Sequence, residues 1–308
     1  MFSIVTFVKG DSSLAAERII GSEEILLKSY LEQEPNLLKN SITMGLPLSL
    51  ESSDHDGSIS ADVYGIFDHP FSSVLNMLTI PATWCDVASL HPNVRACIYE
   101  ELPSEWQLTF YIGRKTDQSL EDTHQYTYHY RRIAEQQGYL DIILSANEGP
   151  FGTKNHKMRF EAVSLQGGRT FVHVSYGYRS AFSTRLMGTI YFATFGRGKA
   201  GFTVTGTDSK GNPVYIGGQR GAMERNIVRY FFAIQAFIDT LHYPEENRLS
   251  MRISKWYDLS SRFKKQLYEM EKKDYITFKT ENHNKQVALQ RQIPTSFRSA
   301  PGHNKSIE

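Results

Sequence analysis

Residues 217–244 read GGQRGAMERNIVRYFFAIQAFIDTLHYP. Gly217, Gly218 and Gly221 allow a tight turn at the start of this stretch, and Pro244 marks its end. Between them apolar side chains recur every three or four positions, which predicts one long helix with an apolar face. The residues of that face are Met223, Ile227, Tyr230, Phe231, Ile234, Phe237, Ile238 and Leu241.

Stretches that are typical of strands precede this helix. Six of them lie at 94–100, 106–115, 125–133, 139–145, 157–165 and 170–178. The connections between them are short, so we expect successive strands to pair antiparallel, because parallel pairs need long crossovers. An alternating stretch at 58–67 predicts one strand before them, and two short helices are predicted at 71–79 and 81–90.

The rest of the chain is predicted from its apolar spacing and its breakers. It is expected to hold a hairpin at 201–216 and helices at 184–195, 11–38 and 245–278. Pro35 is expected to end the first helix, and the polar segment 51–58 reads as a linker. Beyond about Asn284 the apolar period is lost, so residues 284–308 are predicted to be a disordered tail.

Composition and charge disfavour several classes of protein. The chain has 308 residues, of which 34 are basic and 33 acidic, for a formal net charge of +1. Nucleic-acid-binding proteins usually show a basic excess, so no nucleic-acid partner is predicted. No apolar run reaches the length of a transmembrane helix. The run Phe2–Val8 is short for a signal peptide and lacks a basic region, which at face value indicates a cytoplasmic protein.

The order of these elements resembles the helix-grip fold of START-like and Bet v 1-like (SRPBCC) proteins. Six segments look like a bacterial START-like family without an assigned activity: DHPFSSVLNMLTIPATWCDVASLHPNVRAC, ANEGPFGTKNHKMRFEAV, RTFVHVSYGY, GKAGFTVTG, GGQRGAMERNIVRYFFAI and SRFKKQLYEMEKKDY. The resemblance implies an α+β fold in which a curved antiparallel sheet wraps the long C-terminal helix and leaves a cavity between them. It also implies export to the periplasm, and it supplies no catalytic residues.

On this basis the chain divides into four parts. Residues 57–242 form the START-like domain, with an insertion at about 180–216. Residues 1–50 are an N-terminal helical extension, residues 245–283 are a C-terminal helical extension, and residues 284–308 are the tail.

Aromatic and apolar residues at alternate strand positions share one face, because side chains repeat every two residues along a strand. Such faces are usually core, and in a helix-grip fold the same surface also forms the wall of the cavity. The candidate cavity residues are Trp84, Trp106, Leu108, Phe110, Tyr126, Tyr128, Tyr130, Val174, Tyr176, Tyr230, Ile234 and Phe237.

No motif predicts a catalytic residue, a cofactor or a metal site. GRGKAG at 196–201 fits the spacing G-x-G-x-x-G, but a helix is expected before it and a strand after it, which is the wrong order for a dinucleotide site. No two of the ten histidines have the i, i+4 spacing of an H-E-x-x-H zinc site. We therefore interpret GRGKAG as a turn between two elements, and the histidines as polar or solvated side chains.

Three hypotheses for function remain. The first is binding of an apolar or amphipathic small molecule, for example a lipid, in the cavity without catalysis. The second is an enzyme of hydrolase, cyclase or isomerase type, which needs a titratable group in the cavity. Its candidates are His129, His173, Glu161 and Asp141. The third is a protein-interaction module, favoured if an apolar stripe along 249–275 is exposed.

Two smaller expectations concern Cys85, Cys97, Arg225 and Arg229. We expect the two cysteines, twelve residues apart, to lie close enough for a disulfide, which would favour an oxidising compartment such as a bacterial periplasm. The alternatives are a buried structural thiol and a reactive Cys85.

Arg225 and Arg229 point away from the apolar face of the long helix, so we expect surface or interdomain ion pairs, or docking of the 245–283 segment through Glu269 and Glu271.

Overall fold

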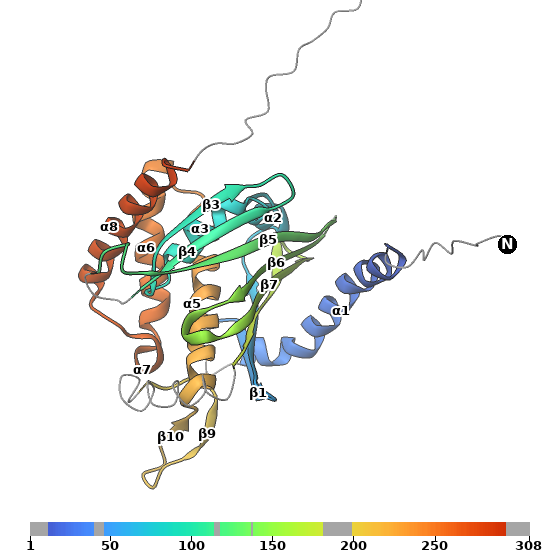
Figure 1. Cartoon of the computed structure of the whole chain (residues 1–308). Helices are drawn as coiled ribbons and strands as arrows, with labels where there is room; N and C mark the ends of the chain where they lie inside the picture. The colour runs from blue at the N-terminus through green and yellow to red at the C-terminus, as the bar shows by residue number, and fades with distance from the viewer. Residues whose placement is uncertain (1–11, 40–45, 114–117, 137, 181–198, 294–308) are drawn as a thin grey trace, which may run out of the picture.

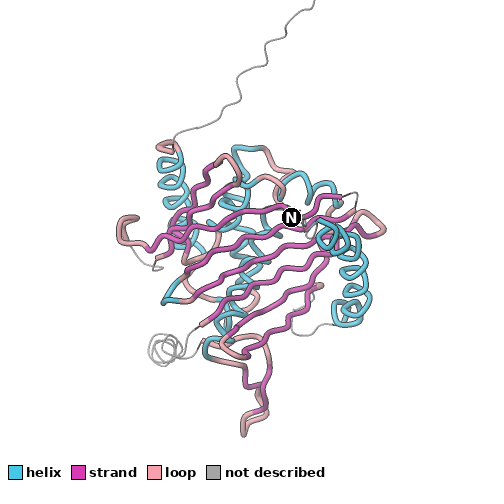
Figure 2. Tube along the Cα trace, turned by 45° about the vertical axis from the view of Figure 1, so that its right-hand side comes forward, coloured by secondary structure: helices cyan, strands magenta, loops and turns pink. Residues whose placement is uncertain are grey.

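The computed structural model describes residues 12–39, 46–113, 118–136, 138–180 and 199–293 (Figure 1). Within these ranges eight strands form one antiparallel sheet in the order β1-β2-β8-β7-β6-β5-β4-β3. The strands are β1 (Leu48–His55), β2 (Ser58–Phe67), β3 (Val94–Glu101), β4 (Trp106–Ile112), β5 (His124–Gln136), β6 (Tyr139–Glu148), β7 (Lys154–Leu165) and β8 (Arg169–Arg179). Figure 2 shows these strands as one continuous layer with helices behind it.

The inner face of the sheet packs on the long helix α5 (Gly218–Asp239), and the short helices α2 (Phe71–Leu78) and α3 (Pro81–Ser89) lie beside it (Figure 1). The predicted α+β helix-grip fold is therefore confirmed. Gly65 in β2 shows how closely helix and sheet approach, because a side chain at this position would collide with the ring of Phe231 in α5. That ring packs against Phe67, with the ring centroids 5.3 Å apart.

The segment after α5 folds back onto it as α6 (Glu245–Ser261), α7 (Lys264–Leu267) and α8 (Lys272–Gln290). Its apolar stripe is buried: Ile253, Trp256, Leu259, Phe263, Leu267 and Tyr275 are each at most 5 % exposed. Phe263 stacks on Phe232 of α5, and Trp256 Nε1 donates to the carbonyl of Arg229. The stripe therefore covers the second flank of α5, and the condition that favoured a protein-interaction module is not met.

Arg229 and Arg225 are buried, so the expectation of surface ion pairs is wrong for both. Arg229 pairs with Glu269, which lies between α7 and α8, and so helps to dock the C-terminal segment. Glu271 is exposed and accepts a hydrogen bond from Tyr268 instead. Arg225 donates to the carbonyl of Ala200, in the segment that leads to the hairpin of β9 (Val204–Thr207) and β10 (Pro213–Tyr215).

Helix α8 covers the edge strand β3 with polar side chains. Gln286 accepts a hydrogen bond from the backbone N–H of Cys97 at 2.9 Å. One turn later, Gln290 accepts from the N–H of Tyr99 and donates to its carbonyl. The buried Lys279 Nζ donates to two further carbonyls, those of His91 and Val94. The outer edge of β3 is thus hydrogen-bonded by a helix rather than by another strand.

Three boundary predictions are wrong. The polar segment 51–58 is not a linker, because it forms most of β1 and a two-residue turn at Asp56 and Gly57, both with positive φ. Pro35 does not end α1, which runs from Ser12 to Lys39. Residues 284–290 belong to α8 and are not part of a tail. The helix predicted at 184–195 lies outside the described residues.

Cys85 of α3 and Cys97 of β3 form a disulfide, with Cα atoms 4.9 Å apart. This lies within the separation of about 7 Å that a bridge requires. Both side chains are 1 % exposed. The bridge fixes the short helix that closes the inner face of the sheet to the strand at the end of that sheet.

We expect the double variant Cys85→Ala/Cys97→Ala to lose about 3 kcal/mol of unfolding free energy, because the unfolded chain is no longer restricted by a small loop. Urea unfolding of both proteins measures this difference. The wild-type protein in reductant, unfolded and refolded so that the buried bridge is reached, is the matched control and should behave like the variant. Equal midpoints for all three samples would contradict the prediction.

None of the described helices is both long enough and apolar enough to cross a membrane.

Candidate functional site

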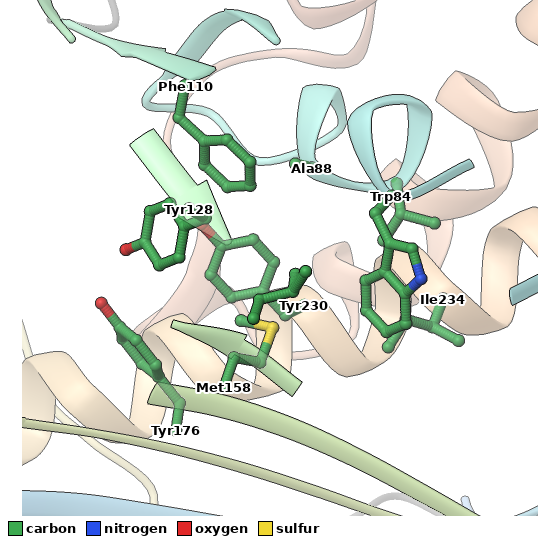
Figure 3. A pocket seen from close by; sticks show the side chains of 10 residues that line it. Trp84, Ala88, Phe110, Tyr128, Met158, Tyr176, Tyr230 and Ile234 are labelled. Atoms are coloured by element: carbon green, nitrogen blue, oxygen red, sulfur yellow. The ribbon is translucent and has the colours of Figure 1, made fainter. Parts of the chain in front are cut away.

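A cavity lies between the inner face of the sheet and α5, and α3 closes one side of it (Figure 3). Its described lining residues come from three sources. Helix α3 provides Trp84, Val87 and Ala88, the strands provide Phe110, Tyr128, Leu144, Met158 and Tyr176, and α5 provides Tyr230 and Ile234. The space open to the centre of a water molecule is about 10 Å³, which is room for about one water. The side chains themselves therefore fill most of the volume between sheet and helix.

The two ends of the cavity differ in polarity. At one end Trp84 turns its ring toward the cavity, while its Nε1 donates to the carbonyl of Leu78 at 2.8 Å and is satisfied there. At the other end the hydroxyl groups of Tyr128, Tyr176 and Tyr230 lie on the same side (Figure 3). The cavity is thus apolar along most of its length and carries phenol oxygens at the end away from Trp84.

His156 in β7 lies behind the tyrosine end. Its Nδ1 is 2.7 Å from the hydroxyl of Tyr176, and its Nε2 is 2.8 Å from Oγ1 of Thr153. Burial lowers the pKa of His156 to about 4, so the imidazole is neutral at physiological pH. Gly149 makes room for the ring, because a side chain at that position would collide with it.

The tyrosines at this end are protonated. Burial raises the pKa of Tyr128 to about 12, and it raises the pKa values of Tyr176 and Tyr230 above their usual range. Neighbouring phenol groups add to the upward shift at Tyr176 and Tyr230, whereas at Tyr128 the contact with Tyr176 partly opposes it. The site is therefore uncharged over the whole physiological range of pH.

Six of the twelve candidate cavity residues line the cavity: Trp84, Phe110, Tyr128, Tyr176, Tyr230 and Ile234. The other six, Trp106, Leu108, Tyr126, Tyr130, Val174 and Phe237, belong to the surrounding core. Four lining residues were missed, namely Val87, Ala88, Leu144 and Met158. The spacing of positions 84, 87 and 88 on one helical face was the signal that could have found the first two.

The four titratable candidates for an enzyme do not line the cavity. Asp141, Glu161 and His173 lie on the outer face of the sheet, at positions that alternate with the inward residues of β6, β7 and β8. His129 bonds to Glu105 at 2.9 Å on a part-exposed surface. The prediction that one of these four groups lies in the cavity is therefore wrong.

His173 is held between two carboxylates on that outer face. Its ring nitrogens lie 2.9 Å from Asp62 and 3.0 Å from Glu161. Burial alone would lower the pKa of His173, but the hydrogen bonds to Asp62 and Glu161 prevail and raise it to about 9. The imidazole is therefore charged in the folded protein at neutral pH, and it stacks on the ring of Tyr64.

This pair of contacts makes stability depend on pH. The folded pKa of about 9 lies above the unfolded value of about 6.5. The stabilisation is therefore complete below pH 6.5 and is lost as the pH rises through 9. We expect roughly 3 kcal/mol of unfolding free energy to disappear between about pH 6.5 and 9.5 in urea titrations. His173→Gln, the matched variant, should start less stable and vary less over this window, and parallel curves would contradict the assignment.

Comparisons with known proteins reveal likeness only at the level of three-dimensional structure. No family model matches the chain, and no curated protein matches its sequence. A norcoclaurine synthase from Thalictrum flavum, solved with a transition-state analogue, aligns with 8 % identity and a TM-score of 0.33 over 46 % of this chain and 84 % of that one. The di-domain aromatase/cyclase BexL aligns with 14 % identity and a TM-score of 0.34 over 75 % of this chain and 61 % of that one.

A conserved protein of unknown function from Enterococcus faecalis aligns over 82 % of this chain and 98 % of that one, with 8 % identity and a TM-score of 0.31. The matching structures include Bet v 1-like proteins. At these identities and TM-scores the likeness carries no inference about a ligand or a reaction. The helix-grip fold of this chain rests on its own sheet order and on the position of α5.

Proposed function

We propose that this protein binds an apolar or amphipathic small molecule, for example a lipid, between the sheet and α5, and that it does not catalyse a reaction there. The observation that carries the proposal is the cavity, whose ten described lining residues include no Asp, Glu, Lys, Arg or His. Ligand sites are commonly apolar and aromatic with a few polar groups, and this lining fits that description.

The space that is free now is far smaller than such a ligand, so binding has to move side chains. Met158 lies in the middle of the lining, and its unbranched side chain with three rotatable bonds can change shape without leaving the core (Figure 3). Movement of this residue away from α5 would enlarge the cavity between the aromatic rings. Contacts between the ligand and the lining would then replace contacts that the lining side chains make with one another in the empty protein.

The proposal is tested with a variant in which a larger side chain fills the cavity. Protein purified from its natural host under native conditions is analysed by native mass spectrometry and by solvent extraction. We expect the wild type to carry a small molecule and Ile234→Trp, which places a larger side chain in the lining, to lose it. Val214→Trp, on the exposed β10, is the matched control and should keep the molecule. A molecule that is retained equally by both variants, or absent from the wild type, would refute cavity binding.

The domain division and the location are part of this proposal. The ten lining residues in the described part of the chain lie between positions 84 and 234, within the 57–242 segment that we infer to be the ligand-binding domain. The disulfide supports work in an oxidising compartment such as a bacterial periplasm, because disulfides are rare in the cytosol. Fractionation of cells that express the full natural gene, with detection of the bridged form, tests the location.

A further inference from the structure

Helix α3 is the most weakly supported wall of the cavity. It spans only Pro81–Ser89, and its outer face at Pro81, Ala82 and Asp86 is partly exposed to solvent. The other walls are held from both sides. Each strand that lines the cavity is hydrogen-bonded to two neighbouring strands, and α5 lies between the sheet and the segment α6–α8. Of the sheet, α5 and α3, the last therefore breaks the fewest contacts when it moves.

Helix α3 is held at its start, at its end and in its middle. At its start, the hydroxyl of Tyr130 donates to the carbonyl of Thr79 at 3.0 Å. At its end, the hydroxyl of Tyr275 in α8 donates to the carbonyl of Leu90 at 2.6 Å. In the middle, the disulfide joins Cys85 to β3. This covalent bond limits how far the middle of α3 can move.

Cys85 lies among the lining residues of α3. Trp84 precedes it directly, and Val87 follows two positions later. The bridge holds the Cα atom of Cys85 4.9 Å from that of Cys97, so it also keeps Trp84 and Val87 against the cavity. An outward movement of α3 that admits a ligand pulls Cys85 away from β3, and the bridge resists this movement.

The bridge can be reached chemically only by the same movement. Both cysteines are 1 % exposed, so a thiolate cannot attack either sulfur until α3 separates from β3. A dithiol reductant then supplies two electrons and two protons. The bond between the two sulfurs breaks, both cysteines become thiols, and the dithiol closes into its own disulfide.

We propose that α3 is the gate of the cavity, meaning the wall that moves to let a ligand pass, and that the Cys85–Cys97 disulfide restrains it. With the bridge intact the ligand exchanges slowly, and with the bridge reduced by a dithiol it exchanges quickly. The proposal rests on the proposed function, since it concerns how the ligand of the same cavity enters and leaves. In an oxidising compartment the bridged form predominates, so a bound ligand is retained until the protein meets a dithiol.

The first test measures the exchange of a neutral fluorescent probe, N-phenyl-1-naphthylamine, by stopped-flow mixing with the full chain. We expect Cys85→Ala/Cys97→Ala to bind and release the probe about tenfold faster than the bridged wild type. His173→Gln, a destabilised variant on the outer face of the sheet, controls for lost stability and should exchange like the wild type. Ile234→Trp fills the cavity, so it should abolish the probe signal.

The second test determines whether ligand exchange and reduction use the same opening. Tyr275→Phe keeps the ring and the disulfide but removes the hydrogen bond to the end of α3. We expect probe release and reduction by dithiothreitol, followed by alkylation and mass spectrometry, both to become about two- to tenfold faster, because one hydrogen bond is lost. Tyr257→Phe, whose hydroxyl donates to the carbonyl of Met270 instead, is the matched control and should change neither rate.

The outcomes separate the two proposals. A probe signal that Ile234→Trp abolishes, with equal rates in the bridged wild type and the double cysteine variant, would overturn the gate and leave an apolar cavity that binds ligands. If none of the proteins shows a signal that Ile234→Trp abolishes, both proposals are removed. If the double cysteine variant does not fold, Tyr275→Phe decides alone. A rise in both of its rates would support a shared opening, and a rise in one or in neither would contradict it.

Discussion

Glu269→Ala is expected to lower the free energy of unfolding by about 3–5 kcal/mol, because it leaves a buried guanidinium without its carboxylate. Arg229 is 3 % exposed and pairs with one oxygen of Glu269, while Lys199 Nζ lies 3.0 Å from the other oxygen. Burial already lowers the pKa of Arg229, which shows how strongly its surroundings disfavour an isolated charge. The loss should appear in urea unfolding as a lower midpoint.

Two variants control for other causes. Glu271→Ala removes the same side chain two positions along the chain, where it is exposed, and should change stability by less than about 0.5 kcal/mol. The double variant Arg229→Met/Glu269→Leu removes both charges and should recover most of the loss, since an apolar pair needs no compensation. A value for Glu269→Ala within about 1 kcal/mol of the wild type would show that the pair contributes little.

The second large effect is expected at Glu224 of α5, whose side chain is completely buried. Its carboxylate accepts four hydrogen bonds. They come from the backbone N–H groups of Phe202 and Thr203, the hydroxyl of Thr203 and the hydroxyl of Ser52. One side chain thus ties β1 and the start of the 202–207 segment to the long helix.

Glu224→Ala leaves these donors without an acceptor, so we expect a loss of about 3 kcal/mol or more. Native-state hydrogen exchange provides a local measurement, because the amides of Phe202 and Thr203 should exchange much faster in the variant. Glu245→Ala, at an exposed position in α6, is the control and should leave both stability and exchange unchanged. Slow exchange of the two amides in Glu224→Ala would contradict the assigned hydrogen bonds.

The sequence was informative where burial follows a simple period. The strands β3 to β8 and the helix α5 bury apolar residues at alternate positions or at every third and fourth position, and their predicted ranges agree closely with the structure. Strand β1 was missed because it is an edge strand with mostly exposed polar residues, although the Asp56-Gly57 pair is a strong hairpin signal.

Helix α8 was cut short for a different reason. Its buried residues Tyr275, Lys279, Asn282 and Gln286 have helical spacing, but three of the four are polar. A search for apolar periodicity cannot detect a helix whose buried face bonds to the backbone of a strand. Helix α1 continues past Pro35 because the proline lies near its end, where it costs one hydrogen bond to a carbonyl, that of the exposed Leu31.

The cavity was predictable only in outline. Alternation along the strands identifies the inward side chains, and six of the twelve chosen residues line the cavity. Core and cavity wall share this face, so the pattern cannot separate Leu108 from Phe110, which lie two positions apart on β4. Whether an inward residue belongs to the core or lines the cavity depends on how closely α5 approaches its strand. At one end of the sheet, the close contact at Gly65 sets the distance between α5 and the sheet.

The glutamine contacts of α8 also bear on solubility. An open sheet exposes unpaired backbone groups at its two ends, and such edges are templates on which chains add to one another and aggregate. In this protein Gln286 and Gln290 occupy the backbone groups of Cys97 and Tyr99 that an incoming chain would need. At the opposite end, β1 carries the acidic residues Glu51 and Asp54, which disfavour the approach of another strand. Helix α8 therefore blocks the addition of another strand at the β3 edge of the sheet. This effect does not depend on what the cavity binds.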